Sequence, residues 1–375
     1  MSAPLAPTQG EPRPLGGDRG DLRMGETAGR PVVLDYGDPA AEYAALRSGA
    51  MLVDRSYRAR YRVTGPKAAE TITGLVTNDV LGLAPGHGLY AAALTAKGRI
   101  VADMRIYALP EDMLPGGLLL DVPPRASAGW AELVRKYVNP RLATCRDESA
   151  AMRAVGVFGT QARRIVAELT GLNATALGVS PPYVLATAHV GGAAVIVARV
   201  PDLGVEGYEM YAPAESASTL WDGLRAAGAT PAGLAAWEVA RIEAGRPEWG
   251  LDVDDGTIPQ EANLDELHAI SYTKGCYTGQ EVVARVHFRG HVNRHLRGLH
   301  FHAAGPGDTL PPGRAPLFDA AGKAVGDVRS TVRSPRLGAI GIAMVRRESR
   351  PDDVLTARWE GGEVPATVRG LPFEG

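Results

Sequence analysis

The sequence predicts an α+β protein with two pseudo-symmetric β-α-β-β-β-α units and a small C-terminal antiparallel β-barrel. Three observations support this fold class. A Val-x-Gly-x-x-Ala segment occurs twice, a similar order of strands and helices follows each copy, and the last part of the chain consists of short alternating segments between turns. A chain of 375 residues is long enough for two or three domains. We expect a first unit over residues 31–150, a second over 151–294, and the barrel over 295–375.

Residues 1–30 are predicted to be a disordered tail, because they are rich in proline, glycine and charge and offer little to bury. Acidic residues such as Glu11 and Asp18 argue against an organelle transit peptide, and the segment lacks the apolar core of a signal peptide. We find no apolar run of about 18 residues that predicts a membrane span. Two cysteines do not suggest a secreted disulfide scaffold, so we expect a reducing, cytoplasmic location.

The composition is that of an ordinary globular protein, with 45% hydrophobic and 22% charged residues. The formal net charge of -2 gives no global basic field, so direct binding of nucleic acid is not expected. Two cysteines cannot supply a four-cysteine zinc or iron–sulfur site within one chain.

The first unit begins at Val63-Thr64-Gly65-Pro66-Lys67-Ala68, where a strand-like alternation ends and a helix-like stretch over residues 68–75 begins. The runs that follow are strand-like at 89–94, 99–107 and 117–122 and helical at 126–138.

The second unit repeats this order after Val157-Phe158-Gly159-Thr160-Gln161-Ala162. Its further elements are a helix-like stretch at 162–169, strand-like runs at 183–190, 193–200 and 207–212, and a helical run at 215–227. Both closing helices carry Trp-x-x-Leu, so we infer two related units.

A further helix is predicted after Thr230 and Pro231, which suit the N-cap and the first helical position, and it ends near Gly245. The helix is apolar on two faces and should be largely buried. Its Arg241 then needs a partner, for which Glu238 and Glu243 are local candidates. Alternating segments at 296–302, 339–345 and 354–359, separated by turn residues, predict the barrel.

The segment Lys274-Gly275-Cys276-Tyr277-Thr278-Gly279-Gln280-Glu281 holds one of the two cysteines, between a cation and a turn. A neighbouring lysine lowers the pKa of a thiol and favours the reactive thiolate. The two glycines indicate a bent, accessible backbone. From this spacing alone, a reactive cysteine and a structural one are equally well supported.

Three histidines downstream, His287, His291 and His295, would align on a helix as metal ligands. Residues 282–286 are instead predicted as a strand, and Gly290 interrupts the run, so no metal site is expected.

Several segments resemble the folate-binding family related to the glycine-cleavage aminomethyltransferase, or T-protein. The resemblance runs from about Ala50 to the C-terminus and is strongest at residues 241–245 and 204–209, with another matching segment at 78–80. Within that superfamily, Lys-Gly-Cys-Tyr-x-Gly-Gln-Glu resembles the signature of the YgfZ branch, whose members are similar to folate-dependent factors for assembly or repair of iron–sulfur proteins. Aminomethyltransferases proper have a different, cysteine-free sequence there. The resemblance implies a ring of three domains around a central folate cavity.

The resemblance also implies tetrahydrofolate or a derivative as cofactor. It makes Glu209 the carboxylate that accepts the paired N–H groups of a pterin. It places Asp103 near the reactive folate nitrogens, where a carboxylate can stabilise cationic character or shuttle a proton. Tyr90 and Tyr107 match positions that line the pterin pocket, although pattern alone is equally consistent with strand aromatics that only pack.

The same resemblance gives Arg241 the role of holding Glu209 or a polar group of the folate. Trp249 replaces a family tyrosine and can still stack on a flat ring. Two departures concern the aminomethyltransferases: Ala102 stands where they carry the first of two acids, and Asp202 stands where they have a tyrosine.

The leading expectation is a tetrahydrofolate-binding accessory protein that supports assembly or repair of iron–sulfur proteins, with Cys276 as its key thiol. Its partners would be the iron–sulfur assembly machinery or client enzymes, because one thiol cannot hold a cluster alone. An effect on tRNA modification would then be indirect. The alternative is a genuine aminomethyltransferase that uses a lipoyl carrier protein; Ala102 and the cysteine motif count against it. Whether any reaction is catalysed stays open at this point.

Overall fold

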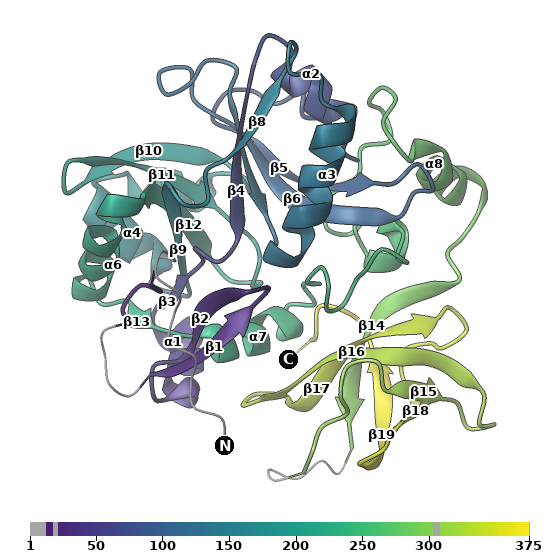
Figure 1. Cartoon of the computed structure of the whole chain (residues 1–375). Coiled ribbons are helices and arrows are strands. Elements are labelled where there is room, and N and C mark those ends of the chain that lie inside the picture. The colour runs from purple at the N-terminus through teal and green to yellow at the C-terminus, as the bar shows by residue number, and fades with distance from the viewer. Residues whose placement is uncertain (1–12, 18–21, 303–307, 375) are drawn as a thin grey trace. The chain divides into compact units, whose positions relative to one another are not determined.

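The computed structural model describes residues 13–17, 22–302 and 308–374 (Figure 1). Its contacts divide the chain into two compact units that interleave along the sequence. The first unit comprises Met1–Arg62, Arg146–Pro201 and Val205–Trp237, and the second comprises Val63–Cys145, Asp202–Gly204 and Glu238–Gly375. Strands from distant segments pair within the first unit, and the domain limits near residues 150 and 294 stay predictions.

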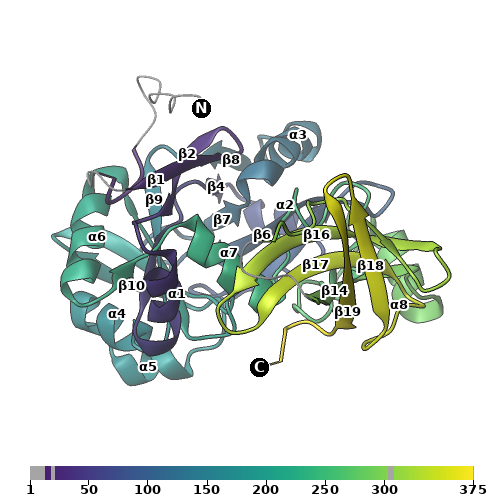
Figure 2. The ribbon, with the colours of Figure 1, turned by 90° about the horizontal axis from the view of Figure 1, so that it is seen from below.

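The first unit is built on a six-stranded sheet that is antiparallel except where β13 pairs with β3. The strand order is β10 (Leu185–Val190), β11 (Ala193–Arg199), β12 (Gly207–Pro213), β9 (Met152–Phe158), β3 (Met51–Asp54) and β13 (Thr230–Pro231). The helices are α1 (Pro39–Ser48), α4 (Ala162–Thr170), α5 (Ala174–Val179) and α6 (Ala217–Ala226). Figure 2 shows α4, α5 and α6 gathered beside β10.

The core of the first unit lies on one face of this sheet. Strand residues that alternate along β9 and β12, among them Val155, Val157 and Met210, pack in one cluster with Ile165 of α4 and Trp221 of α6. Because side chains alternate between the faces of a strand, Glu209 and Tyr211 of β12 face the other way. That second face carries the polar cluster described below.

Part of the predicted N-terminal tail is a β-hairpin. Strand β1 (Arg23–Thr27) pairs with β2 (Arg30–Asp35), although residues 1–30 were predicted to be disordered. Ala28 and Gly29 connect the strands with φ of 50° and 78°, the left-handed backbone of a tight two-residue hairpin turn. The hairpin buries Val32 and Val33, and this apolar burial stabilises a segment that the composition of residues 1–30 alone did not predict to be ordered. Residues 1–12 and 18–21, for which a disordered tail is also predicted, lie outside the described residues.

The second unit contains a five-stranded sheet and the C-terminal barrel. The sheet order is β5 (Gly88–Leu94), β6 (Ile100–Ala108), β7 (Leu118–Val122), β4 (Ala59–Thr64) and β8 (Thr144–Asp147). Strands β4 and β8 each span a residue at which the chain passes from one unit to the other. The helices are α2 (Ala68–Thr73) and α3 (Ser127–Tyr137), and α3 packs against β6 (Figure 1).

The predicted repeat is confirmed. The element order β4-α2-β5-β6-β7-α3 recurs as β9-α4-β10-β11-β12-α6, with the short helix α5 inserted after α4. The repeated glycines, Gly65 and Gly159, share φ values of 128° and 133°. A Cβ at either position would lie 2.6 Å from a backbone carbonyl oxygen, so only glycine fits there. The equivalent tryptophans of the closing helices, Trp130 and Trp221, are both buried.

Helix α7 (Leu234–Glu243) is shorter than predicted, because Thr230 and Pro231 form strand β13 instead of the helix start. Gly245, with φ of 64°, follows its end as expected.

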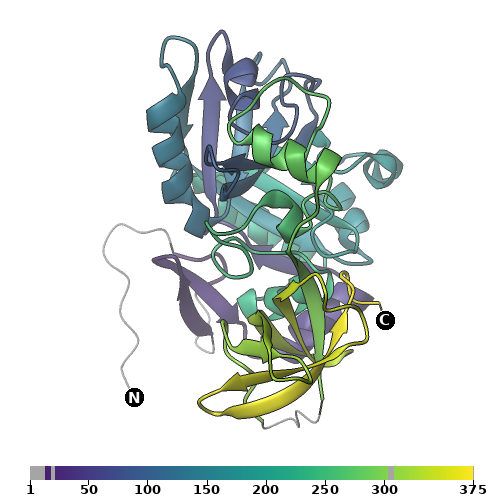
Figure 3. The ribbon, with the colours of Figure 1, turned by 90° about the vertical axis from the view of Figure 1, so that its right-hand side faces the viewer.

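The C-terminal domain is a closed barrel of six antiparallel strands, as predicted. The order is β14 (Arg294–Phe301), β17 (Gly338–Arg346), β16 (Ala324–Ser334), β15 (Pro316–Phe318), β18 (Val354–Trp359) and β19 (Gly362–Arg369), and β19 pairs with β14 to close it. Figure 3 shows these strands curling around one another. Their inward side chains form a continuous apolar core that includes Leu299, Leu317, Val328 and Leu355.

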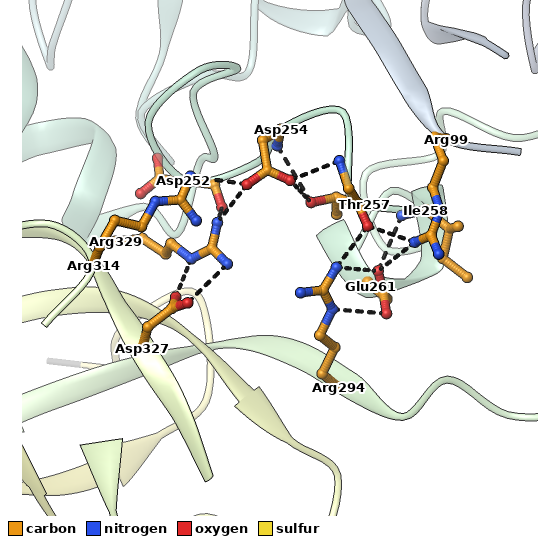
Figure 4. A network of polar contacts seen from close by, with 11 residues as sticks. Arg99, Asp252, Asp254, Thr257, Ile258, Glu261, Arg294, Arg314, Asp327 and Arg329 are labelled. Carbon is orange, nitrogen blue, oxygen red and sulfur yellow. Dashed lines mark hydrogen bonds and ion pairs between the residues drawn. The ribbon is translucent and has the colours of Figure 1, made fainter. Parts of the chain in front are cut away.

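A polar network ties the segment before the barrel to the barrel strands (Figure 4). Asp254 accepts hydrogen bonds from Arg314 at 2.8 Å and from Arg329 of β16 at 3.1 Å. Glu261, in the short helical turn η3 (Pro259–Ala262), accepts from Arg294 of β14 at 2.9 Å. These charge-assisted bonds fix the connector on the barrel within the second unit.

The prediction of a strand over residues 282–286 is wrong: they belong to helix α8 (Gln280–Arg289). The β-branched valines favour a strand, but Gly279, with φ of 82°, starts the helix, and Glu281 pairs with Arg285 one turn later at 2.6 Å. No helix among the described residues is long and apolar enough to cross a membrane.

Candidate active site

One face of the five-stranded sheet carries a line of polar side chains. Asp103, Arg105 and Tyr107 alternate along β6, and the register places Tyr90 of β5 and Asp121 of β7 on either side of Arg105. All five side chains are buried. Buried polar groups need partners, so the contacts among these residues decide what the face can do.

Tyr90 and Asp103 form a buried hydrogen-bonded pair. The Tyr90 hydroxyl donates to Asp103 Oδ2 at 2.6 Å, and the two residues are 4% and 7% exposed. The guanidinium of Arg246 lies 4.3 Å from the centroid of the Tyr90 ring, a cation–π contact that holds the ring. The Tyr90 hydroxyl thereby orients the carboxylate of Asp103.

Arg105 links two further carboxylates on the same face. It donates to Asp202 and lies 3.7 Å from Asp121, and Arg246 lies 3.5 Å from the other oxygen of Asp202. Asp202, at the position where the resemblance places a family tyrosine, therefore forms ion pairs with two arginines. Together with Asp103, the face holds three carboxylates and two guanidinium groups away from water, where electrostatic effects are strong.

Ala102 does not remove an acid from this face. It is fully buried and precedes Asp103 on β6, so its side chain points to the opposite, apolar side of the sheet. Met104 and Ile106 share that side and are fully buried. An acid at position 102 would lie on the other side of the sheet from Asp103, so the departure at Ala102 leaves the polar face intact.

Glu209 lies in the first unit with a different set of neighbours. Its Oε1 accepts from Arg55 Nε at 3.1 Å, and its Oε2 accepts from the Tyr211 hydroxyl at 3.2 Å. Arg55 also donates to the Tyr57 hydroxyl, and its guanidinium lies 3.7 Å from the centroid of the Trp237 ring. The carboxylate assigned to a pterin is thus engaged by an arginine of the chain itself.

Arg241 is fully buried and pairs locally. It donates to both oxygens of Glu238, at 2.8 and 2.6 Å, and to Asp252 Oδ2 at 2.7 Å. Burial lowers the pKa of Arg241, but Asp252 and Glu238 raise it more, so the pKa is raised and the cation is kept. Of the two local partners that the sequence offers for Arg241, the structure pairs it with Glu238. These carboxylates and Ser330 Oγ take up guanidinium donors, and the role of Arg241 in holding Glu209 or a polar group of the folate stays a prediction.

Trp249 is half-buried, and its indole Nε1 is buried without a hydrogen-bond partner among the described residues. An indole N–H in this state can donate to a ligand. The stacking role expected for Trp249, and the pocket-lining role expected for Tyr107, stay predictions.

Lys274 is engaged by backbone and is not a free cation beside Cys276. Its ammonium donates to the carbonyls of Thr73, Val76 and Asn78, and it lies 4.6 Å from the centroid of the Tyr277 ring. Burial lowers the pKa of Lys274 to about 8, with Asp79 opposing the shift. The lysine therefore fixes residues 274–277 against the end of α2.

The rest of the motif also has a structural explanation. A Cβ at Gly279 would lie 2.5 Å from the Thr95 carbonyl oxygen, so glycine allows close packing where α8 begins. Gln280 accepts from the Tyr277 N–H at 3.4 Å, and Glu281 forms the surface pair with Arg285. Gly275 and Cys276 are exposed.

The histidines named above lie on different elements. His287 is near the end of α8, where it stacks on Tyr272 with ring centroids 3.6 Å apart, whereas His291 follows Gly290 and His295 lies in β14. Within the described part of the chain, no group of three or more histidine, cysteine or acidic side chains is placed to hold a metal ion.

Sequence reasoning missed several residues of both clusters, namely Arg55, Tyr57, Arg105, Asp121, Trp237 and Arg246. The sequence could have identified Arg105, because it alternates with Asp103 in an otherwise apolar strand and so lies on the same face of the sheet. Another signal was present for Arg55, which continues the alternation of the buried Met51 and Val53. A charged residue in phase with a buried strand face requires a partner.

The fold and the buried polar face define a class of proteins with two α+β units and a closed C-terminal barrel. The chain matches the family model of the GCVT N-terminal domain over residues 23–271 and that of the glycine cleavage T-protein C-terminal barrel domain over residues 294–373. The chain belongs to the glycine cleavage T-protein family.

Relatives of this family cover the chain from end to end. It is 30% identical to an aminomethyltransferase of Bordetella parapertussis, over 100% of this chain and 97% of the relative. It is also 30% identical to an aminomethyltransferase of Rubrobacter xylanophilus, over 94% and 90%. In fold, it is similar to the glycine cleavage system aminomethyltransferase T of Bartonella henselae, with a TM-score of 0.82, 23% identity and 94% coverage of both chains.

These relatives correct the leading functional expectation. They are named aminomethyltransferase, which contradicts an accessory protein of iron–sulfur assembly with Cys276 as key thiol and favours the alternative. They give no support for the YgfZ branch, for iron–sulfur partners or for a role in tRNA modification. The structural engagement of Lys274 and Gly279 explains why the motif can be present without that function.

Proposed function

We propose that the protein is an aminomethyltransferase that transfers the methylene carbon of an aminomethylated thiol carrier, of the lipoyl-protein type, to tetrahydrofolate, with release of ammonia and the free carrier thiol. The proposal is supported by similarity to aminomethyltransferases over the whole chain. The observation that carries it is the buried Tyr90–Asp103 pair, at the position that the resemblance assigns to the acid beside the reactive folate nitrogens.

Tetrahydrofolate, when bound, would supply two nitrogens that accept the one-carbon unit, one in the reduced pterin ring and one just outside it. The task of the chain is to stabilise positive charge and to hold a proton there, and a buried carboxylate does both. Tyr90 keeps Asp103 in one orientation, and Arg246 keeps the Tyr90 ring in place. Tyr90 and Arg246 act as positioning residues for the carboxylate.

The residues of the second unit fit such a ligand. Asp103 supplies the acid, and the Trp249 indole N–H is a buried donor without a partner among the described residues. Ala102 does not count against the proposal, because position 102 faces away from the polar side of the sheet. In the first unit the fit is incomplete, because Arg55 already bonds to Glu209.

The experiment is a transfer assay with purified protein, aminomethylated lipoyl carrier protein and tetrahydrofolate. We expect catalytic formation of methylenetetrahydrofolate and ammonia. Asp103→Asn should lower the rate by about 10²–10⁴-fold, the range found for positioned acid–base groups. Asp222→Asn, which removes a carboxylate on the surface of α6, is the matched control and should keep the rate. A wild-type protein without turnover, or an Asp103→Asn variant as fast as wild type, would refute the proposal.

A further inference from the structure

In the first unit, Arg55 forms a hydrogen bond with Glu209, the carboxylate that the family resemblance assigns to a pterin. Arg55 and Glu209 are 1% and 0% exposed, and Arg55 Nε donates to Glu209 Oε1 at 3.1 Å. The other oxygen accepts from Tyr211. Both oxygens of Glu209 therefore already accept hydrogen bonds from within the chain.

The surroundings of Arg55 resemble those that a flat amidine-bearing ring would need. Its planar guanidinium lies 3.7 Å from the centroid of the Trp237 ring and 5.2 Å from that of Tyr57. The guanidinium donates its Nε–H to Glu209. A pterin has the same features in its N–H and exocyclic amine, which need an aromatic stacking surface and a carboxylate.

The sheet is built to accept Arg55 at this place. In the register, Gly156 of β9 stands between Glu209 of β12 and Val53 of β3. A Cβ at Gly156 would lie 2.5 Å from the Phe158 ring and 3.3 Å from Arg55 Cγ, so the glycine leaves room for both side chains. The Arg55 N–H also bonds to the Ala154 carbonyl at 2.9 Å, which fixes the backbone of the arginine on β9.

We propose that Arg55 competes with the pterin edge for Glu209 and thereby sets the affinity and specificity of the first unit for a pterin ligand. The inference rests on the proposed function. Two sets of N–H donors at one carboxylate repel each other, and the guanidinium cancels the charge that would attract the ligand. A pterin gains the full hydrogen-bonding capacity of Glu209 only when Arg55 is displaced.

Displacement has space available. The Tyr57 hydroxyl, which accepts from Arg55, belongs to a side chain that also lines a cavity of about 330 Å³ in the first unit. A shift of Tyr57 toward this cavity would release one anchor of the guanidinium, while Trp237 stays in place as a stacking surface.

The test measures the Kd of tetrahydrofolate by calorimetry for the wild type, Arg55→Met and Arg55→Met/Glu209→Gln. We expect Arg55→Met to bind at least tenfold tighter than wild type, and we expect the double variant to lose that gain. Arg62→Met is the matched control, because Arg62 is another arginine of this unit paired with a carboxylate, Glu148, at 2.8 Å, and neither residue lines this cavity. It should leave the Kd within about twofold.

Circular dichroism establishes that each variant is folded. If Arg55→Met does not fold, Arg55→Gln, which keeps a neutral donor near Glu209, should tighten binding at least threefold. An unchanged or weaker affinity in the folded Arg55 variants would overturn the inference and leave the transferase proposal in place if wild type turns over. Absence of tetrahydrofolate binding in every variant, together with absence of turnover, would overturn both.

Discussion

Replacing Arg241 by methionine should destabilise the second unit strongly. The five N–H donors of the guanidinium bond to Glu238, Asp252, the Arg246 carbonyl and Ser330, with distances from 2.6 to 3.1 Å. Methionine fills a similar volume but pairs with none of them. The change therefore leaves the carboxylate of Asp252, which is 0% exposed, without its cation.

The magnitude follows from what each partner can do afterwards. Glu238 is 29% exposed and can be rehydrated, so it contributes little to the loss. Asp252 stays buried, but it keeps hydrogen bonds from the Glu248 N–H at 2.8 Å and the Ser330 hydroxyl at 2.6 Å. Breaking a buried ion pair lowers the free energy of unfolding by about 3–5 kcal/mol. Because Asp252 keeps these two hydrogen bonds, we expect a loss near the lower end of that range, about 3 kcal/mol.

Urea unfolding of wild type, Arg241→Met, Asp252→Asn and the double variant measures this loss as a double-mutant cycle. We expect the double variant to be less destabilised than the sum of the two single variants, because the asparagine removes the unpaired charge. A loss below about 1 kcal/mol for Arg241→Met, or strict additivity, would show that the ion pair does not hold α7 to residues 246–254.

Four further predictions concern pH, the thiols and the motif lysine. Burial raises the pKa of Asp254, but bonds from Thr257, Arg314, Gly256 and Arg329 lower it, to about 2 from its ordinary 3.8. Its contribution to stability should therefore be complete above about pH 4 and be lost as pH falls toward 2, and acid unfolding of Asp254→Asn should lack this step. Cys276 is exposed and Cys145 half-buried, so a thiol reagent should modify Cys276 first in the native protein. Cys276→Ser should keep the transfer rate within about twofold; a tenfold loss would restore a role for the thiol. Lys274→Met should cost about 1–3 kcal/mol in urea unfolding, because three carbonyls lose their donor, and no measurable cost would contradict the anchoring role.

Local patterns predicted the repeated order of elements and the barrel because both depend on periodicity within short segments. The two Val-x-Gly segments are predictable for the same reason, since Gly65 and Gly159 each solve one local steric problem. The interleaving of the units was not predictable, because it depends on which distant strands pair, as β3 does with β9. Residues 282–286 were assigned to a strand because valine propensity was weighed without the helix start at Gly279.

The candidate site was predictable only in part. Asp103 and Tyr90 were both named from the resemblance, but their direct hydrogen bond required the register of β5 on β6. Arg55, Arg105 and Arg246 were missed because a charge partner is identified by space and not by sequence distance. Arg55 and Glu209 are 154 positions apart. The structural role of Lys274 was likewise hidden, since its acceptors are backbone carbonyls, which carry no sequence signal.

The interleaved path of the chain has a consequence for synthesis. The first unit needs segments as far apart as β3 at Met51–Asp54 and β13 at Thr230–Pro231, so the ribosome must complete Trp237 before that unit has all its parts. Residues 63–145 of the second unit are made earlier, but they wait for the barrel at the end of the chain. Neither unit can fold as a finished N-terminal piece during translation, so nascent chains should expose unpaired strands for longer than a protein with sequential domains.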